Sequence, residues 1–144
     1  MTVGPRAVEI ARGWIGTPYV HQGSVKGAGA DCLGLIRGVW RELYGTEPEA
    51  PPPYTPDWGE IGGGEQGPLL AAALRNLVVA EAEASPGEVL LFRMRAGAVA
   101  KHLGILAGGG DSFIHAYERH GVVESPLSAP WRARIVARFR WPAP

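Results

Sequence analysis

Hydrophobic positions change their spacing near the middle of the chain, from a helical period to strand-like runs. Apolar residues recur three and four positions apart within 5–15, 32–44 and 68–77, which is the spacing of one helix face. The later runs are short and rich in β-branched and aromatic residues, and they predict strands over 89–94, 102–107, 112–117, 122–125 and 134–141. Because helices come first and strands second, the pattern favours an α+β fold with an antiparallel sheet.

Boundary residues delimit the first two helices. Pro5 suits a first turn, and Gly16 stops the apolar pattern that follows it. In the second helix Asp31 is the expected N-cap, Cys32 is the first helical residue, and Gly45 ends the stripe. The second helix therefore begins at a cysteine.

Two later segments carry further expectations, and a third leaves its structure open. Residues 108–111, Gly-Gly-Gly-Asp, predict a hairpin turn between two strands. Residues 78–84 fit either a helix tail or an extended segment. Alternation in the last run predicts one buried face, formed by Ile135, Ala137, Phe139 and Trp141.

Composition shows that the chain can form a core despite much Gly and Pro. These two types supply 21 and 13 of 144 residues, roughly twice the usual share of about 12%. The hydrophobic share of 46% nevertheless argues against disorder, and the length fits a single domain over 1–144. Five Pro and six Gly fall within 45–67, which we interpret as one long acidic loop, either a lid or a docking strap.

The formal net charge of zero hides a segregation along the chain. Residues 1–41 carry +3, residues 42–88 carry −8 and residues 89–144 carry +5. The acidic middle either lies against the basic ends or forms a partner surface. No overall basic excess suggests nucleic acid as a partner.

The cysteine count and the apolar runs limit the cellular context. A single cysteine cannot form an internal disulfide, so the chain is able to fold in a reducing compartment. No apolar run approaches the roughly 20 residues of a membrane span, and no basic-apolar signal opens the chain. We therefore expect no membrane span and synthesis in the cytoplasm.

Cys32 is the first candidate for chemistry. The N–H groups and dipole at a helix N-terminus favour an anion, so the position predicts a stabilised thiolate. The Gly-rich segment 27–30 would let a substrate approach the sulfur. The alternative is that Cys32 is a buried structural residue on an apolar stripe.

Two histidines are the candidate partners of this thiol. A nucleophilic thiol needs a base within hydrogen-bond reach and a third group that orients the base. His102 and His115 lie on the strands that flank the 108–111 turn, where an antiparallel hairpin makes them direct or diagonal neighbours. The alternative is a pair of histidines on a solvated strand face.

The remaining histidines offer weaker signals. His120 lies in a predicted turn, and His21 is placed to line the mouth of a cleft. A metal site built from histidines and Cys32 is another chemistry, but no Cys-x-x-Cys or His-Glu-x-x-His spacing supports it. We expect neither a metal nor a cofactor.

Five sequence blocks stand in a fixed order along the chain. They are Gly-Thr-Pro-Tyr-Val at 16–20, Asp-Cys-Leu-Gly-Leu at 31–35, Pro-Gly-Glu-Val-Leu-Leu-Phe at 86–92, His-Leu-Gly-Ile at 102–105 and Phe-Ile-His-Ala at 113–116. Taken together in this order, the blocks resemble the NlpC-type bacterial cell-wall cysteine peptidases. The resemblance implies a reduced papain-like fold, with the nucleophile at the start of a helix packed on an antiparallel sheet that carries both histidines.

The resemblance also implies roles for individual residues. Cys32 matches the nucleophile, His102 the general base and His115 the polar residue that orients the base. Tyr19 matches a tyrosine that helps to bind the developing oxyanion, and Asp31 matches the acidic residue before the cysteine. The family substrates are peptidoglycan stem peptides, typically cut between D-glutamate, through its γ-carboxyl, and a diamino acid.

Two departures from the family pattern bear on substrate binding and context. Leu33 replaces the usual Ser after the nucleophile, and His21 begins the segment that replaces the usual Trp-Gly-Gly. With Leu33 and a Trp-rich C-terminal strand, the chain is most similar to peptidases associated with phage tails and gene transfer agents. That similarity implies tail-tip or baseplate partners, incorporation in a phage-like particle and action on the periplasmic cell wall.

Two other functions fit the same residues. The triad is also compatible with an N-acetylmuramoyl amidase, which cuts the amide between sugar and peptide. A domain without catalysis would instead bind cell wall as a structural part of a tail tip.

Overall fold

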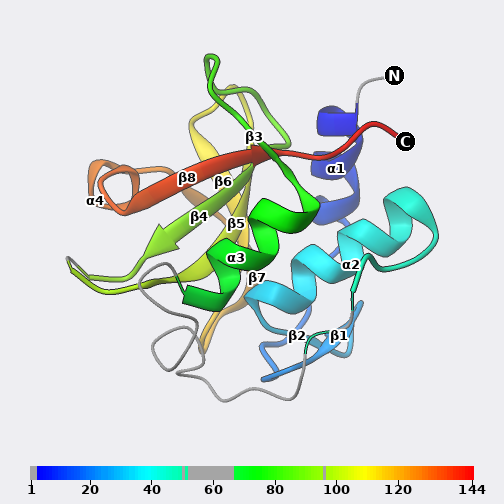
Figure 1. The fold of residues 1–144 in the computed structure, drawn as a ribbon. Coiled ribbons are helices and arrows are strands. Elements are labelled where there is room, and N and C mark those ends of the chain that lie inside the picture. The colour runs from blue at the N-terminus through cyan, green and yellow to red at the C-terminus, as the bar shows by residue number, and fades with distance from the viewer. Residues whose placement is uncertain (1–2, 50, 52–66, 96) are drawn as a thin grey trace.

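The computed structural model describes residues 3–49, 51, 67–95 and 97–144. Helices α1 to α3 precede most of the strands along the chain (Figure 1). The elements are α1 (Val3–Arg12), β1 (Ser24–Val25), β2 (Gly29–Ala30), α2 (Cys32–Tyr44), α3 (Gly67–Asn76), β3 (Val78–Val79), β4 (Val89–Arg93), β5 (Ala100–Ala107), β6 (Ser112–Tyr117), β7 (Gly121–Pro126), α4 (Ala129–Arg132) and β8 (Ile135–Arg140). The predicted α+β class is confirmed.

The predicted helices form, with one boundary corrected. Helix α1 ends at Arg12 rather than at Gly16, and the chain continues in a turn that leaves Ile15 exposed while Trp14 stays buried. Helix α2 begins and ends as predicted, because Asp31 caps its N-terminus and Gly45 adopts a φ of 85° at its C-terminus.

The six-stranded sheet has the order β3-β8-β4-β5-β6-β7, and all of its strand pairs are antiparallel. The predicted 108–111 turn joins β5 to β6. The ambiguous segment 78–84 is extended at its start, where β3 pairs with β8 at the edge of the sheet. A second, two-stranded sheet of β1 and β2 precedes α2 and was not predicted.

One face of the large sheet packs against the helices. In Figure 1, α2 and α3 lie in front of the central strands, and α1, α2 and α3 all contact β5. The side chains between these layers are mostly aliphatic and form the larger core cluster, here called the helix-side core. Its fully buried members include Ala7, Leu35, Val39, Val89, Leu91, Ile105, Ile114 and Phe139.

The opposite face of the sheet carries a smaller core cluster, here called the aromatic-side core. On the sheet it consists of Leu90, Phe92, Leu106 and Phe113. The 127–135 segment covers these residues with Leu127, Trp131 of α4 and Ile135. Alternation along β4, β5 and β6 therefore sends neighbouring residues to two cores of different chemistry.

A β-bulge corrects the predicted face of the last strand. The β4–β8 register steps from Leu91↔Ala137 to Phe92↔Ile135, so Val136 is the extra residue. Ile135 consequently packs on the aromatic side, while Ala137 and Phe139 belong to the helix-side core. The predicted common face of all four residues is wrong at Ile135.

Ion pairs join the acidic middle of the chain to its basic ends. Arg37 and Arg41 of α2 both pair with Glu47, and Arg138 of β8 pairs with Glu88 at 2.6 Å. Most of the predicted 45–67 loop lies outside the described residues. Within the described part of the chain, no helix has the length and apolar character needed to cross a membrane.

Candidate active site

Cys32 owes its position to the tight packing at the start of α2. The Asp31 carboxylate accepts the backbone N–H of Gly34 at 2.7 Å and that of Gln22 at 2.8 Å. A side chain at Gly34 would collide with the carbonyl of Gly23. The glycine two residues after the cysteine therefore lets the preceding loop close over the helix N-terminus.

The two histidines hydrogen-bond to each other, as their places in the hairpin predicted. Nε2 of His102 lies 2.7 Å from Nδ1 of His115. The chain continues beyond them, since Nε2 of His115 lies 2.9 Å from Oγ of Ser125 on β7. These groups form one line across three neighbouring strands.

A second bulge precedes His102. The β4–β5 register steps from Phe92↔His102 to Arg93↔Ala100, which makes Lys101 the extra residue. Bulges beside active sites change the direction of side chains and interrupt regular pairing. Here the bulge lies at the end of β5 that faces the start of α2.

The sulfur of Cys32 contacts β5 at this bulge. Its thiol donates a weak hydrogen bond to the carbonyl of Lys101 at 3.8 Å. The backbone N–H groups of Leu103, Leu33 and Cys32 itself also act on the sulfur. The sulfur thus lies against the backbone on both sides of His102.

The pKa of the Cys32 thiol is shifted in the direction opposite to the prediction. Burial, followed by the charge of Asp31, raises the pKa of this thiol to about 12. The three backbone N–H groups favour the thiolate, as expected at a helix N-terminus, but they are outweighed. The resting thiol is therefore neutral, and the predicted stabilised thiolate is wrong.

Both histidines are neutral for the same physical reason. Burial, together with the charge of His115, lowers the pKa of His102 to about 3. Burial and the charge of His120 lower the pKa of His115 to about 4. Desolvation disfavours the imidazolium form of a buried ring. The predicted alternative, a solvated pair of histidines, is excluded because His115 is fully buried and His102 is 7% exposed.

Aromatic rings enclose the histidine pair. Trp131 meets His115 edge to face at a centroid distance of 5.3 Å and lies 5.8 Å from His102. Phe113 lies 4.1 Å from the ring of His115, and Tyr117 stacks on the same ring. The histidines therefore belong to the aromatic side of the sheet, whereas Cys32 contacts the helix-side core.

The other predicted site residues differ in burial and in their partners. Tyr19 is half-buried, and burial followed by the charges of Cys32, Asp31 and Glu118 raises the pKa of its hydroxyl. His21 is partly exposed, with Nδ1 3.9 Å from Oδ2 of Asp31, while Asp31 itself is buried as the helix cap.

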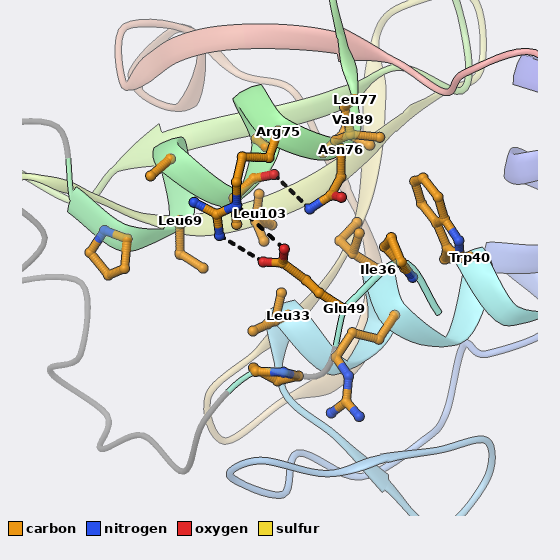
Figure 2. Close-up of a pocket in the computed structure, with 17 residues that line it drawn as sticks. Leu33, Ile36, Trp40, Glu49, Leu69, Arg75, Asn76, Leu77, Val89 and Leu103 are labelled. Carbon is orange, nitrogen blue, oxygen red and sulfur yellow. Dashed lines mark hydrogen bonds and ion pairs between the residues drawn. The ribbon is translucent and has the colours of Figure 1, made fainter. Parts of the chain in front are cut away.

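Leu33 lines a pocket of about 400 Å³ between α2, α3 and the sheet. Figure 2 shows the pocket walls, with Leu33 contributed by α2 and Leu103 by β5. On the rim, Arg75 of α3 pairs with Glu49 at 2.7 Å. Leu33 and Leu103 are the neighbours in sequence of Cys32 and His102, so the pocket adjoins the candidate nucleophile and base.

Sequence reasoning missed Ser125 and Trp131. Neither has a recognisable motif, because each reaches the histidines only through the pairing of β7 and the path of the 127–135 segment. His120 lies in a turn, as predicted, and its ring stacks on that of Tyr117 at a centroid distance of 5.2 Å. Among the described residues, no three His, Cys, Asp or Glu side chains gather as a metal site.

Comparison with known proteins identifies the family. The model of the NlpC/P60 family matches residues 16–140. The chain belongs to the NlpC/P60 family. It is 32% identical over 122 residues to the murein DD-endopeptidase MepS/murein LD-carboxypeptidase of Escherichia coli K12, covering 84% of this chain and 54% of that protein. The chain thus spans about half the length of this curated relative.

A further relative and two solved structures agree with this membership. The γ-DL-glutamyl hydrolase of Bacillus subtilis is 31% identical over 135 residues, which cover 93% of this chain and 28% of that protein. The NlpC/p60 domain of the peptidoglycan hydrolase SagA superposes with a TM-score of 0.61 at 26% identity, covering 94% of this chain and 97% of that one. An NlpC/P60 family protein from Bacillus cereus has a TM-score of 0.66 at 18% identity, covering 96% and 40%, and so supports the fold. The predicted papain-like fold of the family is confirmed.

Proposed function

We propose that the chain is a cysteine peptidase that hydrolyses an amide bond in peptidoglycan stem peptides. The observation that carries the proposal is the placement of the Cys32 sulfur at the start of α2 against the backbone that flanks His102, itself bonded to His115. A thiol, a base and a group that orients the base are the parts that nucleophilic amide hydrolysis needs.

The proposed reaction starts from a neutral pair. Nε2 of His102 is engaged with His115, so Nδ1 is the nitrogen that takes the Cys32 proton as the sulfur attacks the carbonyl carbon. The imidazolium then gives this proton to the leaving amine, and the C–N bond breaks to leave a thioester. Water attacks the thioester carbon while His102 accepts a proton from the water. The C–S bond then breaks, and His102 returns the proton to the sulfur, so that Cys32 is released as the thiol and the product as a carboxylic acid.

The charge that develops on the carbonyl oxygen needs hydrogen-bond donors. The hydroxyl of Tyr19 and the backbone N–H of Cys32 are the proposed donors. Burial keeps Tyr19 in its protonated form because the pKa of its hydroxyl is raised. Asp31 acts on the site as the cap that fixes the helix N-terminus, with His21 at its outer side.

We assign the cut to the bond between D-glutamate, through its γ-carboxyl, and the diamino acid. The name of the Bacillus subtilis relative, γ-DL-glutamyl hydrolase, supports this choice, whereas the name of the Escherichia coli relative specifies a DD-endopeptidase and an LD-carboxypeptidase. An amidase cutting between sugar and peptide would use the same triad. These reactions differ in the fragments that they release.

The test uses two substrates, a disaccharide tetrapeptide and a cross-linked dimer of it, with mass spectrometry of the products. The γ-glutamyl cut releases a dipeptide that begins with the diamino acid. An amidase releases the intact tetrapeptide, and a DD-endopeptidase converts the dimer to monomers. Cys32→Ala should abolish cleavage, while Ser128→Ala, at an exposed serine with no side-chain cap bond, should not. Cleavage that survives Cys32→Ala would overturn the thiol mechanism.

We further propose that the enzyme is made in the cytoplasm, joins the tail of a phage-like particle or gene transfer agent, and acts on the periplasmic cell wall. Leu33 after the nucleophile and the C-terminal tryptophans support this context. Mass spectrometry of purified particles should detect the chain together with tail-tip or baseplate proteins. Particles that carry Cys32→Ala should assemble but enter cells poorly. Normal entry would instead favour a structural component without catalysis.

A further inference from the structure

The hydrogen-bond line through the two histidines ends on a hydroxyl. His102 Nε2 bonds to His115 Nδ1, and His115 Nε2 bonds to Ser125 Oγ at 2.9 Å. Ser125 belongs to β7, whose register pairs His115 with Val123, so the serine lies diagonally across from the histidine. Both ring nitrogens of the buried His115 therefore have a partner.

The protonation of this line follows from the neutrality of its rings. A neutral imidazole carries one N–H, and its other nitrogen accepts. If His102 is to accept the Cys32 proton at Nδ1, its own hydrogen must lie on Nε2 and point at His115 Nδ1. His115 must then carry its hydrogen on Nε2, where Ser125 Oγ is the acceptor. The tautomer of His102 is thus linked to the hydroxyl of Ser125, which is two hydrogen bonds away.

We propose that Ser125 is a positioning residue that holds His115 as its Nε2–H tautomer and thereby keeps Nδ1 of His102 open to the Cys32 proton. The inference rests on the proposed function, and it adds a fourth member to the three residues assigned from the sequence. Without the hydroxyl, the N–H of His115 would be buried with no acceptor, and moving the hydrogen to Nδ1 would force His102 into the opposite tautomer.

A hydroxyl suits this position better than a carboxylate would. The aromatic surroundings disfavour charge on His115, whose pKa burial lowers to about 4. A carboxylate at position 125 would favour the imidazolium form, which has no acceptor to offer His102. Ser125 accepts the hydrogen bond without drawing in a second proton, and its half-buried place lets its own hydrogen point outward.

The test compares Ser125→Ala with Ser125→Thr, which keeps the hydroxyl, and with Ser128→Ala as a matched serine that lacks a side-chain cap bond. Ser125→Ala should lower kcat for tetrapeptide cleavage about 10- to 100-fold with KM nearly unchanged. Ser125→Thr should restore most of kcat, and Ser128→Ala should match the unaltered enzyme. Nitrogen-15 NMR of the histidine rings should show Nε2–H on His115 in the unaltered enzyme and a mixture of tautomers in Ser125→Ala.

The outcomes separate this inference from the proposed function. Full kcat in Ser125→Ala, in an enzyme that Cys32→Ala inactivates, would overturn the positioning role and leave the peptidase intact. An Nδ1–H tautomer of His115 in the unaltered enzyme would overturn it as well. The NMR spectrum is read on each folded variant independently of turnover, so it decides the question even if the cleaved bond is another one.

Discussion

The two faces of the sheet share their strands and differ in what they bury. Toward the helices, Leu91, Ile105 and Ile114 pack in an aliphatic core. Toward the 127–135 segment, the neighbouring residues Phe92, His102 and His115 lie among aromatic rings. Because adjacent residues of a strand point to opposite faces, one sheet supplies stability on one side and the base of the candidate site on the other. The helix-side core holds α2 in place, and α2 brings the sulfur to the edge of β5.

The comparison predicts that a histidine on the aromatic side matters for rate. His102→Ala should lower kcat by about 10⁴-fold or more, because it removes the group that accepts the Cys32 proton. Cleavage rates on the tetrapeptide, together with thermal unfolding as the control for folding, test this. A variant that keeps more than a tenth of the rate would show that His102 is not the base.

A substitution in the helix-side core should lower stability and leave kcat nearly unchanged. Ile10 of α1 is buried in the helix-side core, and Ile10→Ala should lower the free energy of unfolding by about 2–5 kcal/mol. At a temperature where the variant is folded, kcat should stay within about twofold. Leu106→Ala is the matched change on the aromatic side, where it removes support from Phe92 and Phe113 and should lower both stability and kcat. Equal kcat in the two variants would show that the aromatic side of the sheet is no more important for catalysis than the helix side.

Stability should fall with acid because the aromatic side keeps its histidines neutral. The pKa of His102 is lowered from 6.5 to about 3 and that of His115 to about 4, so below pH 6.5 the unfolded chain binds more protons than the folded one. The free energy of unfolding should therefore be at its full value above pH 6.5. Below this pH it should decrease by up to about 1.4 kcal/mol per pH unit for each histidine.

Denaturant titrations from pH 7 to 5 measure this slope above the range in which carboxylates titrate. His115→Asn, which has no titrating ring, should remove about half of this slope.

At alkaline pH the dependence of stability on pH has the opposite sign, because the raised pKa of Cys32 makes the folded state retain its proton while the unfolded thiol ionises. Stability should consequently fall again as the pH rises from about 9 toward 12. Iodoacetamide should label native Cys32 more slowly than a model thiol at pH 7.

The smallest expected effect concerns the ring that covers the histidines. Trp131 is partly exposed and lies over both imidazoles, so Trp131→Ala should admit water and raise the pKa of each. The acid limb of the stability curve should shift to higher pH, and kcat should fall about tenfold as the rings lose their fixed positions. Arg132→Ala, beside it and exposed, is the control. An unchanged acid limb would show that Trp131 does not exclude water from the pair.

Much of the fold was predictable because its signals are local. The N-cap Asp31, the C-terminal Gly45 and the 108–111 turn each act through neighbouring backbone, and each lies where its pattern indicated. The errors are also informative. The apolar spacing extends the first helix to Ile15, but the helix is followed by a turn at 13–16. Ile135 faces the aromatic side because Val136 forms a bulge, and this bulge depends on the pairing of β8 with β4.

The sequence by itself determined the order of the longer helices and strands, the place of Cys32 at a helix start and the pairing of His102 with His115, because these follow from periodicity, caps and a short hairpin. Tertiary structure alone decided the protonation of the site. The thiol is neutral and the rings are uncharged because distant segments enclose them, and Ser125 and Trp131 meet the histidines only through strand pairing and the returning chain. Desolvation depends on atoms gathered from the whole fold, so no local pattern records it.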